Sequence, residues 1–158
     1  MDMSDSHFMQ LALEQAKLAG LAGEVPVGAV IVQDGVVIAT GCNAPISDQD
    51  PTAHAEIKAL RAAAKQLGNY RLVGCELFVT LEPCTMCLGA ISHARVSRLV
   101  FAATEPKAGM IVSQQDFSQV TFYNHFLTVK QGVMAEQSRA LLQDFFRHRR
   151  EQKKQMRE

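Results

Sequence analysis

Four residues in two short segments have the types and the spacing of a metal-dependent active site. His54 and Glu56 lie two positions apart in "PTAHAEI", and Cys84 and Cys87 lie three apart in "LEPCTMC". Side chains at the start of a helix can converge on one point, and the free N–H groups there stabilise thiolates. One imidazole and two thiolates suit Zn²⁺. The two segments therefore predict a zinc site between two helix starts.

The number of ligands indicates which kind of zinc site this is. Three protein ligands leave one position of a tetrahedral zinc open, which is typical of catalytic sites, whereas structural sites have four ligands. Water in that position has its pKa lowered to about 7. Glu56 is predicted to lie beside this water without binding the metal, and to act as general base and then general acid. Taken without His54, the Cys84-x-x-Cys87 motif fits a redox pair as well as a metal site. Taken alone, His54 or Glu56 fits a structural role.

Hydrophobic runs and turn signals predict the elements that position these residues. Thr52 is expected to cap the helix that carries His54, and Pro83 to lie in the first turn of the helix that carries the cysteines. Asp34-Gly35 predicts an antiparallel hairpin, and the helix between the third and fourth strands favours a parallel pair. We expect a mixed sheet with helices on both faces. The predicted strands are 25–32, 36–40, 75–81, 98–103 and 126–131, and the predicted helices are 7–22, 53–67, 83–93 and 134–158.

The distribution of charge differs between the body of the chain and its end. We expect one domain over residues 1–158, since no repeat or linker interrupts it. The formal net charge of the chain is zero. From Arg139 onward, however, there are seven Lys or Arg residues and three acidic residues, which gives this end a net charge of +4. Such a basic end favours a polyanion partner, although a solvated terminal helix gives the same pattern. The buried face of that helix is expected to consist of Leu141, Leu142, Phe145 and Phe146.

Cysteine use and the first residues of the chain favour a cytoplasmic location. No apolar segment is long enough to cross a bilayer, so no membrane partner is expected. The segment "MDMSDSHFMQ" lacks the basic and apolar regions of a secretory signal. Without an export signal, four cysteines indicate free thiols or metal ligands. Cys42 and Cys75 lie outside the metal spacing and are interpreted as structural thiols, and Glu82 as a supporting carboxylate.

The two motifs together resemble a known family. H-x-E followed by P-C-x-x-C, thirty residues from the first ligand to the second, is a signature of zinc nucleobase deaminases. Bacterial tRNA-specific adenosine deaminases are similar to this chain nearly end to end, through "EVPVGAV", "DPTAHAEI", "NYRL", "LEPCTMC" and "LLQDFFRHRR". The resemblance implies a cytidine deaminase-like, three-layer α/β/α sandwich around a five-stranded mixed sheet. It also implies a homodimer with one zinc per subunit.

The same resemblance implies a reaction and a set of substrate contacts. The reaction is hydrolytic deamination of adenosine to inosine at the wobble position of a tRNA anticodon, with the target base unstacked from the loop. Asn43 is implied to hydrogen-bond the base, Val27 to pack on the purine face, and the Ala55 backbone N–H to read it. Lys107, through a phosphate, and Asn124 are implied to contact the anticodon stem-loop.

The chain departs from the family pattern in one region after the fourth predicted strand. Glu105, the segment 110–112 and Phe126 differ from the residues usual in the family, which leaves the zinc chemistry intact but alters the substrate side. Two alternatives remain open. One is a free-base or nucleoside deaminase that acts on guanine or cytosine. The other is a zinc-stabilised module that binds RNA or a protein partner without catalysis.

Overall fold

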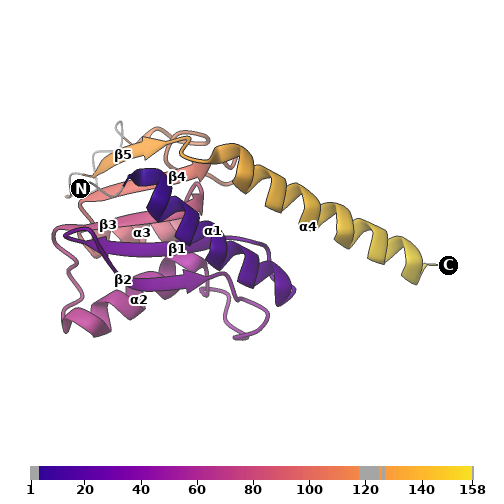
Figure 1. The fold of residues 1–158 in the computed structure, drawn as a ribbon, viewed down its shortest axis with the longest axis horizontal. Helices are drawn as coiled ribbons and strands as arrows, with labels where there is room; N and C mark the ends of the chain where they lie inside the picture. The colour runs from indigo at the N-terminus through magenta and orange to yellow at the C-terminus, as the bar shows by residue number, and fades with distance from the viewer. Residues whose placement is uncertain (1–3, 118–124, 126, 158) are drawn as a thin grey trace.

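The computed structural model describes residues 4–117, 125 and 127–157 (Figure 1). The third and fourth predicted strands coincide with β3 and β4, and the other predicted strands differ from the observed ones at their ends. The elements in chain order are α1 (Asp5–Leu21), β1 (Gly28–Gln33), β2 (Val36–Cys42), α2 (Ala55–Leu67), β3 (Cys75–Leu81), α3 (Thr85–His93), β4 (Arg98–Ala103), β5 (Thr128–Gln131) and α4 (Ala135–Met156).

The strands form one mixed sheet in the order β2-β1-β3-β4-β5. The hairpin predicted from Asp34-Gly35 is confirmed, because β1 and β2 pair antiparallel on either side of this turn. β1 also pairs antiparallel with β3. The predicted parallel pair is confirmed, since β3 and β4, which α3 connects, pair parallel. β5 pairs parallel with β4 on its other side. The carboxyl ends of β3 and β4 therefore lie at the same edge of the sheet as the start of β1.

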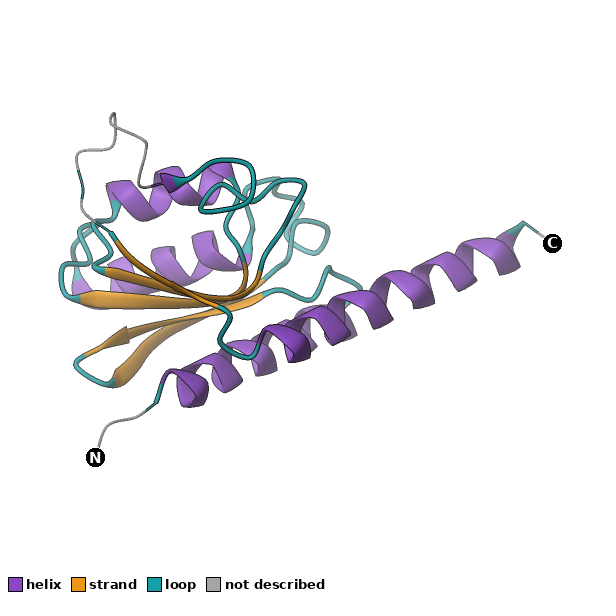
Figure 2. Cartoon of the chain, turned by 90° about the horizontal axis from the view of Figure 1, so that it is seen from above, coloured by secondary structure: helices purple, strands orange, loops and turns teal. Residues whose placement is uncertain are grey.

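Helices cover both faces of this sheet, which confirms the three-layer α/β/α architecture. α1 and α4 lie on one face, and α2 and α3 lie on the other (Figure 2). Neighbouring residues of β3 point to opposite faces. Leu77 and Val79 join the hydrophobic cluster under α2 and α3, whereas Phe78 joins Phe8 and Met9 of α1.

An ion-pair network fastens the start of α1 to the amino end of β4. Both terminal guanidinium nitrogens of Arg98 donate to the carboxylate of Asp5, at 2.9 and 2.8 Å. Glu76 accepts from the same guanidinium at 2.8 Å, and Lys130 donates to Asp5 at 2.8 Å. The hydrogen bond from Arg98 holds the pKa of Asp5 well below its usual range. This network lies at the sheet edge opposite the carboxyl ends of β3 and β4.

The predicted buried face of the last helix is only partly present: Leu142 packs against the core, but none of the four predicted residues is fully buried. Ser138 is the buried residue among the described residues of α4, and its hydroxyl donates to the Thr80 carbonyl oxygen. Phe146 is 42% exposed, while Leu141, Leu142 and Phe145 are half-buried. The reason is geometric: the first half of α4 lies along the body, as far as Arg149, which donates to the Gly23 carbonyl oxygen, and the second half projects past the sheet (Figure 1). Within the described ranges, no helix has the length and apolar character needed to cross a membrane.

Candidate metal centre and active site

Two helices begin close together at one edge of the sheet and bring the predicted ligands to one point. α3 follows directly after β3, with Cys84 as its N-cap residue, and α2 has His54 as its N-cap residue. The first turn of α2 lies directly on β2, because a Cβ atom at Gly41 would lie 2.3 Å from the Ala55 carbonyl oxygen. Neither N-cap side chain bonds its own helix, so both side chains remain available for a ligand.

The predicted positions of both helix starts need correction. Thr52 does not cap α2, because its N–H and hydroxyl both donate to the Asp50 carboxylate, at 2.8 and 2.7 Å, which keeps this segment in a turn. Pro83 lies before the N-cap of α3 and outside its first turn. The two shifts have the same consequence: His54 and Cys84 have extended backbones, and their side chains project off the helix ends.

The three predicted ligand atoms lie within 4.8 Å of one another, and the distances from the imidazole nitrogen to the two sulfurs match those of a zinc site. Nδ1 of His54 lies 3.6 Å from Sγ of Cys84 and 3.5 Å from Sγ of Cys87. Zinc bonds of about 2.3 Å to sulfur and about 2.05 Å to nitrogen at a tetrahedral angle separate these atoms by about 3.6 Å. Among the described residues, this trio is the group that could hold a metal ion, and Glu56 is not a member. The donor set and its dimensions therefore fit a three-ligand zinc.

The electrostatics of the thiols also fit a metal site. Hydrogen bonds with Cys87 and with His54 together lower the pKa of the Cys84 thiol to about 4. Cys84 is therefore a thiolate at neutral pH, the form that binds metal. The hydrogen bond to Cys84 raises the pKa of Cys87, which keeps one proton in the pair. A metal that binds both sulfurs displaces that proton.

Glu56 lies in the first turn of α2, beside the ligands, and is 4% exposed. Burial raises the pKa of its carboxyl group. The Cys87 side chain is among the groups that influence the pKa of this carboxyl group, which places Glu56 next to the trio. A buried carboxylate with a raised pKa can take and return a proton near neutral pH.

Three of the predicted substrate residues, Asn43, Val27 and Ala55, lie near one another at this edge. Asn43 is buried, and its amide donates to the Val25 carbonyl oxygen at 3.2 Å, while its backbone N–H donates to the Val27 carbonyl oxygen at 3.0 Å. Ala55 is the first residue of α2, so its N–H has no acceptor within the helix. Lys107 is exposed in the loop after β4. Asn124 lies outside the described residues.

Glu24 is a buried carboxylate that sequence reasoning did not single out. It is 2% exposed and accepts from the backbone N–H groups of Ile46 and Ser47, at 3.2 and 2.6 Å, and from the Ser47 hydroxyl at 2.7 Å. Glu24 thereby fixes the loop that follows Asn43. The sequence feature that could have indicated its role is a single acidic residue between two apolar segments, in "AGEVPVG".

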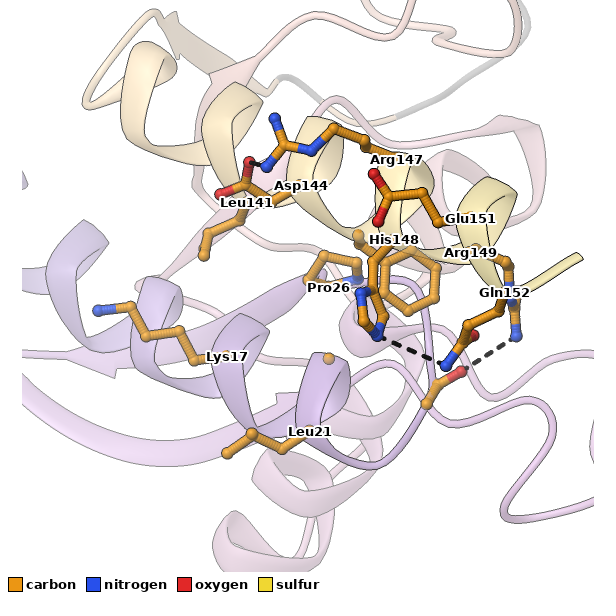
Figure 3. Close-up of a pocket in the computed structure, with 13 residues that line it drawn as sticks. Lys17, Leu21, Pro26, Leu141, Asp144, Arg147, His148, Arg149, Glu151 and Gln152 are labelled. Atoms are coloured by element: carbon orange, nitrogen blue, oxygen red, sulfur yellow. Dashed lines mark hydrogen bonds and ion pairs between the residues drawn. The ribbon is translucent and has the colours of Figure 1, made fainter. Parts of the chain in front are cut away.

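A groove of about 860 Å³ lies beside this edge, between α1 and the middle of α4 (Figure 3). Its lining combines the apolar residues Leu21, Pro26 and Phe145 with charged residues at the rim. The Arg149 guanidinium lies 5.0 Å from the centre of the Phe145 ring and donates to the Gly23 carbonyl oxygen at 3.4 Å. The metal ligands do not line this groove. It meets the predicted substrate side through the loop that continues from Pro26 into Val27.

The fold and the site together define a zinc-dependent deaminase. The model of the cytidine and deoxycytidylate deaminase zinc-binding region matches residues 2–103. The chain belongs to this zinc-binding deaminase family, within the group of tRNA-specific adenosine deaminases.

Individual relatives agree with this assignment. The tRNA-specific adenosine deaminase of Haemophilus influenzae is 52% identical over 95% of this chain and 87% of its own length. A solved structure from a study of A-to-I editing by tRNA:A34 deaminases at the wobble position is 47% identical, with a TM-score of 0.84 over 86% of this chain and 99% of that chain. Guanine deaminase from Bacillus subtilis is 38% identical, with a TM-score of 0.62 over 76% and 87%.

Proposed function

We propose that this protein deaminates the wobble adenosine of a tRNA anticodon to inosine by zinc-dependent hydrolysis. The observation that carries the proposal is the trio of His54, Cys84 and Cys87 with a buried carboxylate, Glu56, beside it. The relatives named above supply the choice of tRNA adenosine over other amino-substituted bases. One zinc per subunit is held by the trio.

Glu56 is the proposed proton carrier of the reaction. Zinc, when bound, supplies the Lewis acid that makes water nucleophilic near neutral pH. Glu56 takes a proton from the water that attacks C6 of the purine and returns it to the substrate, so that the C6–N bond breaks and ammonia leaves. The burial of Glu56 supports this role, because its raised pKa suits a group that takes up and then releases a proton.

Three residues are proposed to orient the adenine. The Asn43 side chain hydrogen-bonds the base, Val27 packs on its face, and the Ala55 backbone N–H donates to it. What supports these roles is their common position at the sheet edge that carries the ligands, and the free N–H of a first helical residue. Lys107 and Asn124 are proposed RNA contacts.

The second half of α4 is proposed to bind the RNA backbone. Its surface carries a set of cations with little packing against the body: Arg147, Arg150, Lys153, Lys154 and Arg157. Contacts of this kind supply affinity that depends on salt but carry no base specificity. The groove beside Phe145 offers the adjoining apolar surface.

Resemblance to the family supports two further proposals. The protein is a homodimer, and it acts in the cytoplasm. Sedimentation equilibrium tests the first, since a dimer has twice the 17.3 kDa mass of the chain. Fractionation of the source cells tests the second.

The reaction is tested by incubating zinc-loaded protein with an anticodon stem-loop that has adenosine at the wobble position. We expect inosine and ammonia in equal amounts, measured by nucleoside analysis and an ammonia assay. A stem-loop with guanosine at that position is the matched control. Absence of inosine from the adenosine substrate, with zinc present in the protein, contradicts the proposal.

A second candidate function is deamination of a free base or nucleoside. The likeness to guanine deaminase and the changed residues after β4 favour it. A panel of guanine, cytosine, adenine and their nucleosides separates the two candidates. Faster ammonia release from one of these than from the stem-loop favours the second candidate.

A further inference from the structure

Glu82 connects the segment that carries the ligand Cys84 to the loop that follows β4. It lies two residues before the ligand Cys84 and is 3% exposed. Its backbone N–H donates to the Ala103 carbonyl oxygen at 2.8 Å, which fixes this segment to the end of β4. Neither the proposed proton transfer nor the ligand set uses its carboxylate.

The Glu82 carboxylate accepts hydrogen bonds from the segment 105–113, named the 105–113 loop. One oxygen accepts from the Glu105 N–H at 3.0 Å and from the Ser113 hydroxyl. The other accepts from the N–H groups of Ile111, Val112 and Ser113, at 3.0, 2.8 and 3.0 Å. Five donors on one buried carboxylate need both of its oxygens as acceptors.

Glycine lets this loop lie directly on the carboxylate. A Cβ atom at Gly109 would lie 2.3 Å from Cδ of Glu82 and 2.4 Å from one of its oxygens. No side chain fits between the loop and the carboxylate at this point. The loop position therefore depends on both partners: Glu82, the residue after β3, and Gly109 of the loop.

The 105–113 loop borders the metal centre and carries a proposed RNA contact. The Met110 N–H donates to the carbonyl oxygen of Pro83, the residue before Cys84, at 3.0 Å. The Lys107 N–H donates to the Glu105 side chain at 3.0 Å. Lys107 is therefore two hydrogen bonds from Glu82, by way of Glu105. Ile111, 1% exposed, anchors the loop in the same hydrophobic cluster as Ala55.

We propose that Glu82 is a positioning residue that sets how tightly the site holds its RNA substrate. It holds the 105–113 loop against the metal centre, so that Lys107 and the exposed side of the loop meet the RNA beside the target adenosine. This inference rests on the proposed function. In it, the hydrogen bonds between Glu82 and the 105–113 loop fix the position of one wall of the site. Proton transfer and metal binding need no contribution from the Glu82 carboxylate. Replacing Glu82 is therefore expected to weaken substrate binding.

The test compares Glu82→Gln with the unaltered protein in a steady-state inosine assay on the stem-loop. An amide has one acceptor oxygen, and its NH₂ group cannot accept from backbone N–H donors. The variant therefore loses the hydrogen bonds that one of the two carboxylate oxygens accepts from the loop. We expect KM to rise about tenfold and kcat to stay within about threefold, because the lost contacts bind substrate and transition state alike. Zinc content is expected to remain unchanged.

Two further variants separate positioning from general stability. Gly109→Ala pushes the loop off the carboxylate from the other side and is expected to raise KM in the same way, even if Glu82→Gln fails to fold. Asp5→Asn removes a comparable carboxylate at the opposite sheet edge, in the network with Arg98, and is expected to leave KM unchanged. An equal rise in KM for Asp5→Asn, or an unchanged KM for folded Gly109→Ala, overturns the inference.

The outcome for the unaltered protein distinguishes this inference from the proposed function. No inosine from the unaltered, zinc-loaded protein contradicts the proposed function itself. Normal inosine formation by that protein, with wild-type KM in a folded loop variant, contradicts only the role of Glu82. Hydrogen exchange of the 105–113 amides gives a readout without activity, and we expect faster exchange in Glu82→Gln.

Discussion

The Sγ atom of Cys84 lies 3.6 Å from Nδ1 of His54, although thirty residues separate them in the chain. Each is the N-cap residue of its helix, and neither side chain caps that helix. The helix starts α2 and α3 thus supply one ligand each from the same backbone position. Cys87 completes the trio from the first turn of α3.

Replacing Glu56 tests the proton carrier. We expect Glu56→Gln to keep its zinc and fold and to lose about 10²- to 10⁴-fold in kcat, since a general acid–base group contributes on that order. Inosine formation and zinc content are measured on the same preparation. Glu14→Gln, the same change at an exposed position of α1, is the control. Unchanged kcat in Glu56→Gln rejects Glu56 as the proton carrier.

Replacing one thiolate tests the metal site. Cys84→Ser is expected to bind far less zinc, because a hydroxyl does not ionise at neutral pH and is a poorer ligand. Metal content is measured by mass spectrometry after dialysis, and thermal unfolding is recorded with and without added zinc. Cys75→Ser, at a buried cysteine outside the trio, is expected to retain the metal. Equal zinc content in the two variants contradicts the assignment.

The base contact proposed for Asn43 predicts a loss of activity. Asn43→Ala removes the amide that donates to Val25 and the group proposed to bind adenine. We expect kcat/KM to fall about tenfold or more, because a buried polar partner is left unpaired in the complex. Steady-state inosine kinetics measure the effect, and circular dichroism verifies the fold. A folded variant with wild-type kcat/KM excludes the contact.

The basic surface of α4 predicts a salt-dependent affinity. Substitution of Arg150, Lys153 and Lys154 by glutamine keeps good helix formers at exposed positions and removes three charges. Binding of the stem-loop should weaken, and the slope of log affinity against log salt should decrease by about 0.7 for each lost phosphate contact. Fluorescence anisotropy at several salt concentrations measures both. Lys65→Gln at the far end of α2 is the control, and equal slopes for all three proteins count against an RNA contact.

The ion pairs of Asp5 predict a loss of stability in acid. Arg98 holds the pKa of Asp5 below its usual range. A carboxylate with a lowered folded-state pKa stabilises the fold above its unfolded pKa and loses that contribution as the pH falls below about 4. Urea unfolding at about pH 6 and about pH 3 measures the difference. Asp5→Asn should show a smaller difference than the unaltered protein, and an equal difference in both contradicts the prediction.

The sequence alone was sufficient for the chemistry and for the strands that form the centre of the sheet. The ligand residues are recognisable because their type and short spacing already restrict the chemistry to a metal with three ligands. The strands 75–81 and 98–103 were predicted at their observed bounds, since continuous apolar runs with clear turn signals leave few alternatives. Joint use of the two motifs also predicted that two helix starts meet, which the distances between ligand atoms confirm.

The structure decided where the helices begin, through local contacts that the sequence pattern did not reveal, and tertiary contacts decided which polar residues hold the loops. His54, rather than Thr52, ends the turn before α2 because Asp50 takes both donors of Thr52. Glu24 and Glu82 bind loops that lie between 22 and 31 residues away in sequence, and no local pattern encodes such distances. Of the four apolar residues predicted to be buried in α4, Leu142 packs against the core, whereas Phe146 is exposed. Periodicity specifies which side of a helix is apolar, but the path of the chain in space determines whether another element covers that side.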